Sequence, residues 1–337
     1  MNNTLGRVVI LGATGTLGTY LMDELVEQGY EVYACARRYM DHPRFSRDGI
    51  HSVALNVVSG AGFERLPQSD VRAVVHIAGA MPSRMEGYKP STYIDVNISG
   101  TLRVLEYCRT VGAQVLVYMQ SHSDVAGWWN SGTPIPADAP RRLNLKGDHA
   151  VYIISKNAAV DLCLHYAQQY ALRTVILRLP TIYAYTPIAE MYVNGIRRPI
   201  AYLYLMQRAA DGEPIEVWGN PDVMKDIVYV KDYTQIVRRA IESANAQGIY
   251  NVGTGVGISL QTQIEGIVQV FSPPGRPSRL VYLPDKPSQM GYIYDVSKTR
   301  RDLGYEPRFF YIEALRDMKL ESQGVRFRHL DQGDLSI

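Results

Sequence analysis

The stretch at residues 7–18, RVVILGATGTLG, decides the fold of this chain. A short strand-like run ends in a turn that contains three glycines, and helical periodicity begins directly after it. Such a turn lets the backbone approach a pyrophosphate, while the helix start offers free N–H groups and the positive end of its dipole to that anion. Because the glycines stand between a strand and a helix, we expect a dinucleotide site formed by Gly12, Thr14, Gly15, Thr16, Leu17 and Gly18.

Strand-like and helical segments alternate through the first half of the chain. Strand-like apolar runs are found at 7–11, 31–35, 51–55, 73–77, 115–119 and 174–178, with helical periodicity at 16–28, 96–110 and 152–170. Repeated strand–helix–strand order predicts an α/β fold with a doubly wound parallel sheet. Frequent prolines after residue 179 break this pattern, which predicts a smaller, irregular C-terminal lobe with loops suited to ligand contact.

These patterns divide the chain into two expected units. Residues 1–178 are expected to form a cofactor-binding domain. The strand-like runs DIVYVKD (226–232) and IYNVGT (249–254) predict that the chain returns to the first sheet near 226–255. We expect the segments 179–225 and 256–337 to form the smaller, substrate-binding lobe.

The composition restricts the class of protein. With 337 residues, 46% of them hydrophobic and 20% charged, the chain can bury a large core. Its 35 Lys and Arg residues nearly balance 33 Asp and Glu residues, so no nucleic-acid partner is expected. Cys35, Cys108 and Cys163 lack metal-ligand spacing, which favours a reducing compartment and predicts no metal site. Neither a secretion-signal pattern nor a run of about 18 apolar residues occurs, so we expect a cytoplasmic protein with no membrane partner.

The end of the second expected strand bears on the choice of cofactor. A site that prefers NAD usually has a carboxylate here for the ribose 2′-hydroxyl, whereas arginine accommodates a 2′-phosphate. This chain has Ala36, Arg37 and Arg38 at that point. Guanidinium groups bind phosphate in a fork geometry, so we expect Arg37 and Arg38 to bind NADP, with NAD as the alternative cofactor. The other interpretation of the two arginines is a solvated pair on a surface loop.

Tyr152 and Lys156 form a candidate proton-transfer pair in the segment YIISK. They are four residues apart in an expected helix and therefore share one face. An unperturbed tyrosine has a pKa near ~10, too high for a base at neutral pH, but a nearby ammonium favours the phenolate. The pair is thus suited to acid–base catalysis.

The motifs taken together resemble the extended short-chain dehydrogenase/reductase family, also called the NAD-dependent epimerase/dehydratase family, of the type that modifies nucleotide sugars. The resemblance implies a Rossmann-type domain for the cofactor, a C-terminal lobe for a nucleotide-diphosphate sugar, and a homodimer formed through the helices near 97–110 and 152–170. It covers essentially the whole chain, in the motifs GATGTLG (12–18), VVHIAG (74–79), DVNISGT (95–101), YIISK (152–156), LRLPTIY (177–183), KDIVYVKD (225–232), YNVGTG (250–255) and DVSKTRRDLGYEP (295–307).

The resemblance also implies roles for single residues. Tyr152 is implied to be the acid/base, with Lys156 on the nicotinamide ribose and Asn97 in the cofactor pocket. The run GYEVYACARR (29–38) is similar to the same region of NADP-using GDP-mannose 4,6-dehydratases. Further cofactor contacts are implied at Asn56, Val57, Ala78, Gly79 and Leu179.

The segment MQSHSD (119–124) departs from the family pattern. When the chain is aligned on Gly127 without a gap, His122 stands where the family has its catalytic Ser or Thr. Either His122 replaces that hydroxyl, or a backbone shift brings Ser121 or Ser123 into the role, or His122 is a non-catalytic histidine. Asp124 is interpreted as a base for elimination, as in dehydratases, or as a loop carboxylate that caps the chain.

The expected substrate lobe shows similar departures. Lys225 stands where the family commonly has an arginine that holds a pyrophosphate, and lysine keeps the charge but loses the bidentate geometry. A second family arginine, in the loop before DVSK, is missing, and Lys286 lies near its position. Thr181 replaces the usual substrate-binding Asn, and Tyr183 is followed by alanine where glycine is typical. We expect these four residues to contact the substrate; for Lys225 the alternative is a solvated charge.

Three functions are compatible with these residues. The first is NADP-dependent redox chemistry at C4 of a nucleotide-diphosphate sugar, as an epimerase or dehydratase. The second is an NADPH-dependent reductase of nucleotide keto-sugars. The third is a non-catalytic NADP-binding sensor or scaffold, which the presence of both Tyr152 and Lys156 argues against.

Overall fold

A computed structural model describes residues 4–38, 42–147 and 149–328. Its centre is a seven-stranded sheet of strand order β13-β6-β5-β4-β1-β2-β3 in which every neighbouring pair is parallel. The expected Rossmann-type α/β fold is thereby confirmed. The strands are β1 (Arg7–Leu11), β2 (Glu31–Ala36), β3 (Ile50–Ala54), β4 (Val71–His76), β5 (Leu116–Ser121), β6 (Thr174–Leu179) and β13 (Gly248–Asn251).

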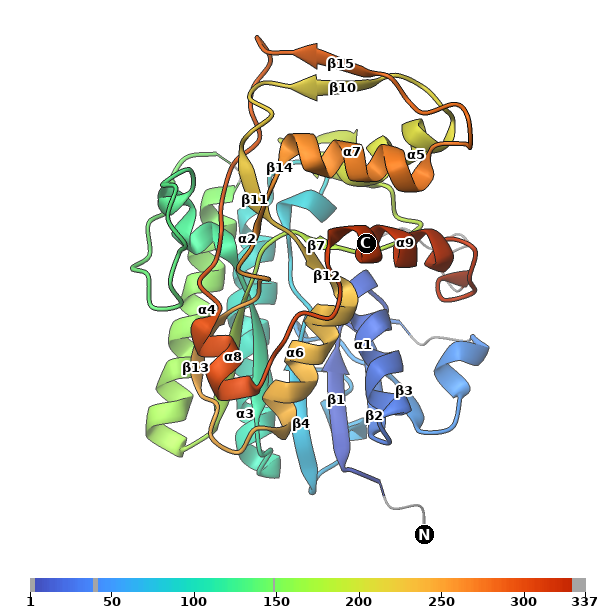
Figure 1. The fold of residues 1–337 in the computed structure, drawn as a ribbon. Coiled ribbons are helices and arrows are strands. Elements are labelled where there is room, and N and C mark those ends of the chain that lie inside the picture. Colours follow the sequence, from blue (N-terminus) through green and yellow to red (C-terminus); the bar gives the residue numbers. More distant parts are fainter. Residues whose placement is uncertain (1–3, 39–41, 148, 329–337) are drawn as a thin grey trace.

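Helices cover both faces of this sheet (Figure 1). On one face, α1 (Thr16–Glu27) packs beside α6 (Val230–Glu242), and their apolar residues share one buried core. On the other face, α3 (Gly100–Val111) and α4 (His149–Tyr170) bury a second core. The sheet strands are strongly apolar because both faces are covered.

The strand order reverses between β1 and β4. After β1 the chain runs outward to β2 and β3, then crosses to β4 on the other side of β1. In open α/β sheets a ligand binds outside the carboxyl ends of the strands at such a point. The glycine turn after β1 lies at this edge, as does Ser121 at the end of β5.

The segment 226–232 differs from the expected strand. β11 (Met224–Asp226) and β12 (Val228–Tyr229) are short and lie outside the main sheet, and α6 begins at Val230. The apolar residues of the following segment recur at helical spacing, since Val230, Tyr233 and Val237 are all buried on one face. Within the expected return to the sheet, β13 is the part that joins it, beside β6.

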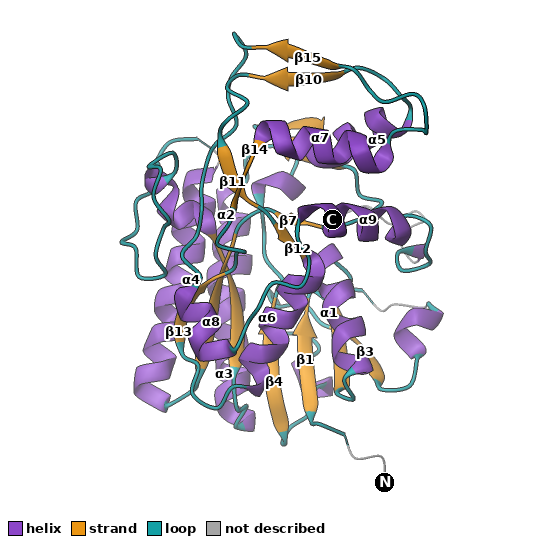
Figure 2. Cartoon of the chain, viewed as in Figure 1, coloured by secondary structure: helices purple, strands orange, loops and turns teal. Residues whose placement is uncertain are grey.

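A smaller, irregular α/β part lies above the sheet (Figure 2). The expected substrate-binding role of this lobe, and its independence as a domain, stay predictions. No helix described in the chain combines the length and apolar content that a membrane span requires. The lobe contains β7 (Ile182–Tyr183), β8 (Glu190–Val193), β9 (Ile196–Pro199), α5 (Ala201–Ala210), β10 (Ile215–Trp218), β14 (Gly257–Ser259), α7 (Leu260–Phe271), β15 (Leu280–Leu283) and α9 (Tyr311–Glu321), while α8 (Ser297–Leu303) packs beside α6.

Candidate active site

The glycine turn brings three backbone segments into close contact. Gly12 has a φ of 93°, and a Cβ there would come within 2.9 Å of the backbone nitrogen of Ala78 in the loop after β4. A Cβ at Gly18 would come within 2.2 Å of the carbonyl oxygen of Gly12. The strand, the turn and the helix therefore pack as a glycine-dependent unit.

The start of α1 is suited to an anion. Gly15 is the N-cap residue and supplies no side-chain hydrogen bond to the first turn, which contains no acidic residue. The first N–H groups of a helix lack intrahelical partners and carry the positive end of the helix dipole. This environment is suited to a pyrophosphate at Thr16, Leu17 and Gly18, and Thr14 lies in the same turn. Their expected cofactor contacts stay a prediction.

The edge of the sheet beyond β2 carries cationic side chains. Ala36 ends the strand without offering a carboxylate, and Arg37 and Arg38 follow it with exposed side chains. Asn56 accepts hydrogen bonds from the backbone of Val58 and Ser59 through Oδ1, so its side chain shapes the loop after β3. Val57 is buried against α3, where a Cβ at position 100 would come within 2.9 Å of it.

Asn97 holds the loop after β4 against α4. Its Oδ1 accepts a hydrogen bond from the backbone of Ala80 at 2.8 Å, and its Nδ2 donates to Ser155 Oγ at 2.9 Å. Gly79 lies so near that a Cβ there would be 3.2 Å from Asn97 Oδ1. Leu179, expected at the cofactor, ends β6 opposite Ser121 and is partly buried. Asn97 therefore joins two of the segments that border the expected cofactor pocket.

Ser121 provides the hydroxyl partner of Tyr152. Ser121 Oγ accepts a hydrogen bond from the backbone N–H of Ser123 at 3.3 Å. Its own proton is thus available for Tyr152, and this hydrogen bond lowers the pKa of the phenol. Burial has the larger effect and raises the pKa of Tyr152 above its ordinary value of 10.0. Of the two serines, Ser123 contributes its backbone N–H to this arrangement.

Lys156 lies one helical turn beyond Tyr152 and is buried. Its ammonium stands 4.2 Å from the centroid of the Tyr118 ring, a cation–π contact that partly offsets the loss of water. Burial lowers the pKa of Lys156 to about 7. The residue can therefore change protonation state near neutral pH, and it lies on the same helix as the phenol that it is expected to assist.

His122 is turned toward the C-terminal lobe. Its Nδ1 is 2.8 Å from the hydroxyl of Tyr294, and its ring packs against Trp129 and Tyr292. Burial, reinforced by Lys225 and Arg178, lowers the pKa of His122 to about 3. The described partners of His122 thus belong to the lobe and its adjoining loop, whereas Ser121 is the residue that affects the pKa of Tyr152. This arrangement favours the alternative in which Ser121 fills the hydroxyl role, and that role stays a prediction.

Asp124 forms a buried ion pair with Arg178. Both of its carboxylate oxygens accept hydrogen bonds from Arg178 at 2.9 to 3.1 Å, and the two side chains are 2% and 1% exposed. Arg178 also donates to the Ala137 carbonyl and to Asn251 Oδ1. This geometry contradicts the role of an elimination base and agrees with the alternative of a carboxylate that fixes the loop.

The expected substrate residues fall into different environments. Thr181 is exposed in the loop after β6, and Lys225 on β11 is partly buried with its ammonium 5.6 Å from the Tyr292 ring centroid. Burial lowers the pKa of Lys225. Lys286 is exposed in the segment after β15, and its ammonium lies 5.4 Å from the centroid of the Trp218 ring at the end of β10.

Tyr183 corrects the expected pocket. It is buried, and its ring stacks on Tyr202 with the centroids 4.2 Å apart. It therefore belongs to the core under the lobe and is not available to a substrate.

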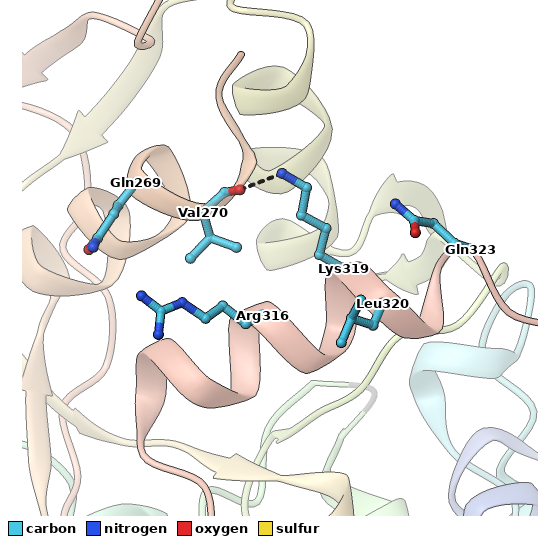
Figure 3. A pocket seen from close by; sticks show the side chains of 6 residues that line it. All are labelled: Gln269, Val270, Arg316, Lys319, Leu320 and Gln323. Atoms are coloured by element: carbon cyan, nitrogen blue, oxygen red, sulfur yellow. Dashed lines mark hydrogen bonds between the residues drawn. The ribbon is translucent and has the colours of Figure 1, made fainter. Parts of the chain in front are cut away.

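Two other features lie outside the expected site. A surface hollow of about 420 Å³ lies between α7 and α9 (Figure 3). It is lined by Gln269, Val270, Arg316, Lys319, Leu320 and Gln323, and Lys319 donates to the Val270 carbonyl at 2.7 Å. Among the described residues, no group of three or more His, Cys, Asp or Glu side chains is arranged to hold a metal ion.

Sequence reasoning missed several polar residues that organise the site. Gln120, Arg178 and Asn157 are all buried, and each has a hydrogen-bond partner from a different element. A sequence signal existed for two of them, since Gln120 and Arg178 interrupt apolar strands near their carboxyl ends. A buried polar residue at such a point requires a partner.

Comparison with known proteins connects this geometry to a family. The model of the NAD dependent epimerase/dehydratase family matches residues 8–253. This chain belongs to that family. It is therefore an enzyme of the extended short-chain dehydrogenase/reductase class, and the resemblance seen in its motifs is confirmed.

Relatives of this epimerase/dehydratase-family enzyme act on nucleotide sugars. A UDP-glucuronate 4-epimerase of Thermodesulfobacterium geofontis is 28% identical over 252 residues, covering 73% of this chain and 71% of that one. The structure of UDP-glucose 4-epimerase from Thermotoga maritima with UDP-glucose has a TM-score of 0.75 at 20% identity, covering 94% and 100% of the two chains. The UDP-glucuronic acid 4-epimerase of Bacillus cereus in complex with NAD has a TM-score of 0.71 at 18% identity, with coverage of 94% and 100%.

Proposed function

We propose that this family member carries out NADP-dependent redox chemistry at C4 of a nucleotide-diphosphate sugar, as an epimerase. The observation that carries the proposal is the group of Ser121, Tyr152 and Lys156 at the same edge of the sheet as the glycine turn. Its phenol, hydroxyl and buried ammonium are suited to moving one proton at a carbon oxygen.

The cofactor would be held by the glycine turn, the start of α1, Asn97 and Lys156. When bound, its nicotinamide supplies the hydride acceptor and donor. Tyr152 takes the proton of the C4 hydroxyl during oxidation and returns it during reduction. Ser121 stabilises the phenolate by donating a hydrogen bond to it, and a protonated Lys156 favours the same charge state.

Epimerisation needs no acid–base group beyond Tyr152, Ser121 and Lys156. A dehydratase requires a further base beside the sugar ring, and the Asp124 carboxylate is bound on both oxygens by Arg178. Reduction of a nucleotide keto-sugar by NADPH is the second candidate. It is favoured by Arg37 and Arg38, because the absence of a carboxylate at the end of β2 suits a 2′-phosphate. Solved relatives are described with NAD, so this cofactor preference is specific to our proposal.

The lobe would hold the nucleotide part of the substrate. Lys225 is a partly buried cation beside the ring of Tyr292, and burial of a lysine costs least when an anion joins it. We assign it to the diphosphate. At the far end of the lobe, Trp218 is 46% exposed and lies beside Lys286, an arrangement suited to a stacked base with a nearby phosphate.

We also propose that the enzyme is a cytoplasmic homodimer. Leu102 on α3 and Ile154 and Tyr170 on α4 are large apolar side chains that are between 41% and 47% exposed. Exposed apolar side chains on adjacent helices favour burial against a second copy. The three cysteines are buried and free, as expected of a protein in the reducing cytoplasm.

Cofactor accounting with candidate nucleotide sugars tests the reaction. Incubation with UDP- and GDP-sugars should give an epimer without net oxidation of NADPH. Tyr152→Phe should lower turnover about 10²- to 10⁴-fold while cofactor binding is retained. Net NADPH oxidation would establish the reductase instead, and cofactor binding without turnover of any sugar would contradict both enzymes.

A further inference from the structure

Gln120 is a buried polar residue, 2% exposed, that joins the end of β5 to α4. Its Oε1 accepts a hydrogen bond from the backbone N–H of Ser121 at 2.9 Å. Its Nε2 donates to Oδ1 of Asn157 at 2.8 Å. Asn157 is 7% exposed and follows Lys156 directly on the helix that also carries Tyr152. One side chain therefore connects the strand that presents Ser121 to the helix that presents Tyr152.

We propose that Gln120 and Asn157 are positioning residues that hold the Ser121 hydroxyl toward the Tyr152 phenol. The inference rests on the proposed function, in which Tyr152 moves the substrate proton. Neither residue touches the phenol itself in the contacts described, so both act through Ser121.

Ser121 is fixed at two of its atoms. Its backbone N–H is bound by Gln120, and its Oγ accepts the N–H of Ser123 at 3.3 Å. The rotation of the hydroxyl is thereby restricted, and its proton is left for Tyr152. That hydrogen bond favours the phenolate, whereas burial favours the neutral phenol. Loss of the Gln120 contact would free the backbone at Ser121 and weaken the effect that favours the phenolate.

The interactions close a ring through the protein. It runs from Tyr152 to Ser121, along the backbone to Gln120, across to Asn157 and back along α4. In a buried ring of this kind, removing either amide leaves the other without its partner. Substitutions at Gln120 and Asn157 should therefore not add to each other.

The test uses Gln120→Leu, Asn157→Leu, the double variant and Ser121→Ala in the full-length enzyme. The matched control is Gln235→Leu on α6, which also removes a 5% exposed glutamine that accepts a backbone N–H, that of Glu306. Two quantities are measured: the pH profile of kcat with a nucleotide sugar, and hydrogen exchange of the segment that contains Ser121. The exchange measurement needs no substrate.

We expect Gln120→Leu and Asn157→Leu to raise the kinetic pKa of the catalytic base by about one pH unit, the worth of one hydrogen bond. The double variant should match either single variant, and Gln120→Leu should add nothing in the Ser121→Ala background. Exchange at Ser121 should accelerate in Gln120→Leu but not in Gln235→Leu.

Two results would overturn the inference. One is unchanged exchange at Ser121 in Gln120→Leu. The other is a pH profile that stays at its wild-type position, or that shifts as far in the Ser121→Ala background as in the wild type. If the wild-type enzyme turns over no nucleotide sugar, the proposed function fails, and the exchange comparison still decides whether Gln120 positions Ser121.

Discussion

At the scale of single residues, the adjacent side chains of Ser121 and His122 lie in different environments. Ser121 lowers the pKa of the Tyr152 phenol, whereas His122 contacts Tyr294, Trp129 and Tyr292. The catalytic hydroxyl of the proposed mechanism is therefore an ordinary serine. The histidine instead forms part of a buried aromatic group that joins the loop after β5 to the C-terminal segment.

Buried histidines make stability depend on pH. The pKa of His76 and of His122 is lowered by burial from 6.5 to about 3. Between these values the unfolded chain binds protons that the folded protein does not, so the free energy of unfolding should fall as the pH falls from about 6.5 toward 3. His122→Phe should weaken this dependence in urea unfolding at about pH 5 and about pH 7. The exposed-site variant His165→Phe is the control, and an equal effect of both variants would contradict the argument.

Arg37 tests the cofactor preference. Because a guanidinium on a 2′-phosphate makes charge-assisted hydrogen bonds, Arg37→Ala should weaken NADP binding about 10- to 100-fold and leave NAD binding nearly unchanged. Titration of both cofactors by calorimetry measures this difference. Arg65→Ala, at an exposed arginine after β3, serves as the control. Equal loss for both cofactors, or no loss for either, would remove Arg37 from the proposal.

At the scale of elements, the turns over His122–Trp128 are fixed by an ion pair with β6. Arg178 has partners in this segment, at Ala137 and in β13, where Asn251 follows Tyr250 at the sheet edge. The bonded groups are buried, so the loop cannot move without exposing unpaired charge. We expect the Asp124–Arg178 ion pair and the hydrogen bond from Ser121 N–H to Gln120 to keep Ser121 in its position.

Loss of this anchor should destabilise the whole protein. Asp124→Ala leaves Arg178 as an uncompensated buried charge, which is expected to cost about 3–5 kcal/mol of unfolding free energy in urea titration. Asp161→Ala breaks the exposed pair with Arg141 and should cost about 0.2–1 kcal/mol. An Asp124 variant with unchanged stability and abolished elimination activity would restore the dehydratase interpretation.

At the scale of the whole molecule, the lobe and the Rossmann part are joined around α1. Thr16 donates to Thr186 at 3.1 Å, and the Tyr20 ring meets Phe327 edge-on with the centroids 5.6 Å apart. Arg326 binds Asp23, which also accepts hydrogen bonds from Arg44 and Arg47. The last described turn therefore packs onto the first helix, and the expected cofactor and substrate regions share one framework.

The exposed apolar side chains of α3 and α4 predict the oligomeric state. We expect a dimer in sedimentation equilibrium, because burial of Leu102, Ile154 and Tyr170 against a second copy removes apolar surface from water. Ile154→Glu should shift the enzyme toward the monomer without loss of its fold. Leu320→Glu on α9, also at an exposed leucine, should leave the dimer intact. A wild-type monomer would contradict the prediction.

The sequence by itself determined the features that depend on local spacing. Glycines 12 and 18 are required where backbones approach, and apolar periods of two kinds predicted the parallel sheet and its helices. Tyr152 and Lys156 share a helix face because they are one turn apart. Each of these properties is set by residues close together in the chain.

Only the tertiary structure decided which side chains meet. Asp124 binds Arg178, which lies 54 positions away in the sequence, Tyr183 stacks on Tyr202 in the core, and His122 meets Tyr294 of the C-terminal segment. The strand prediction at 226–232 failed from Val230 onward for a related reason, since α6 begins there and packs against α1. Partners of this kind depend on how distant elements pack, and spacing along the chain does not contain that information.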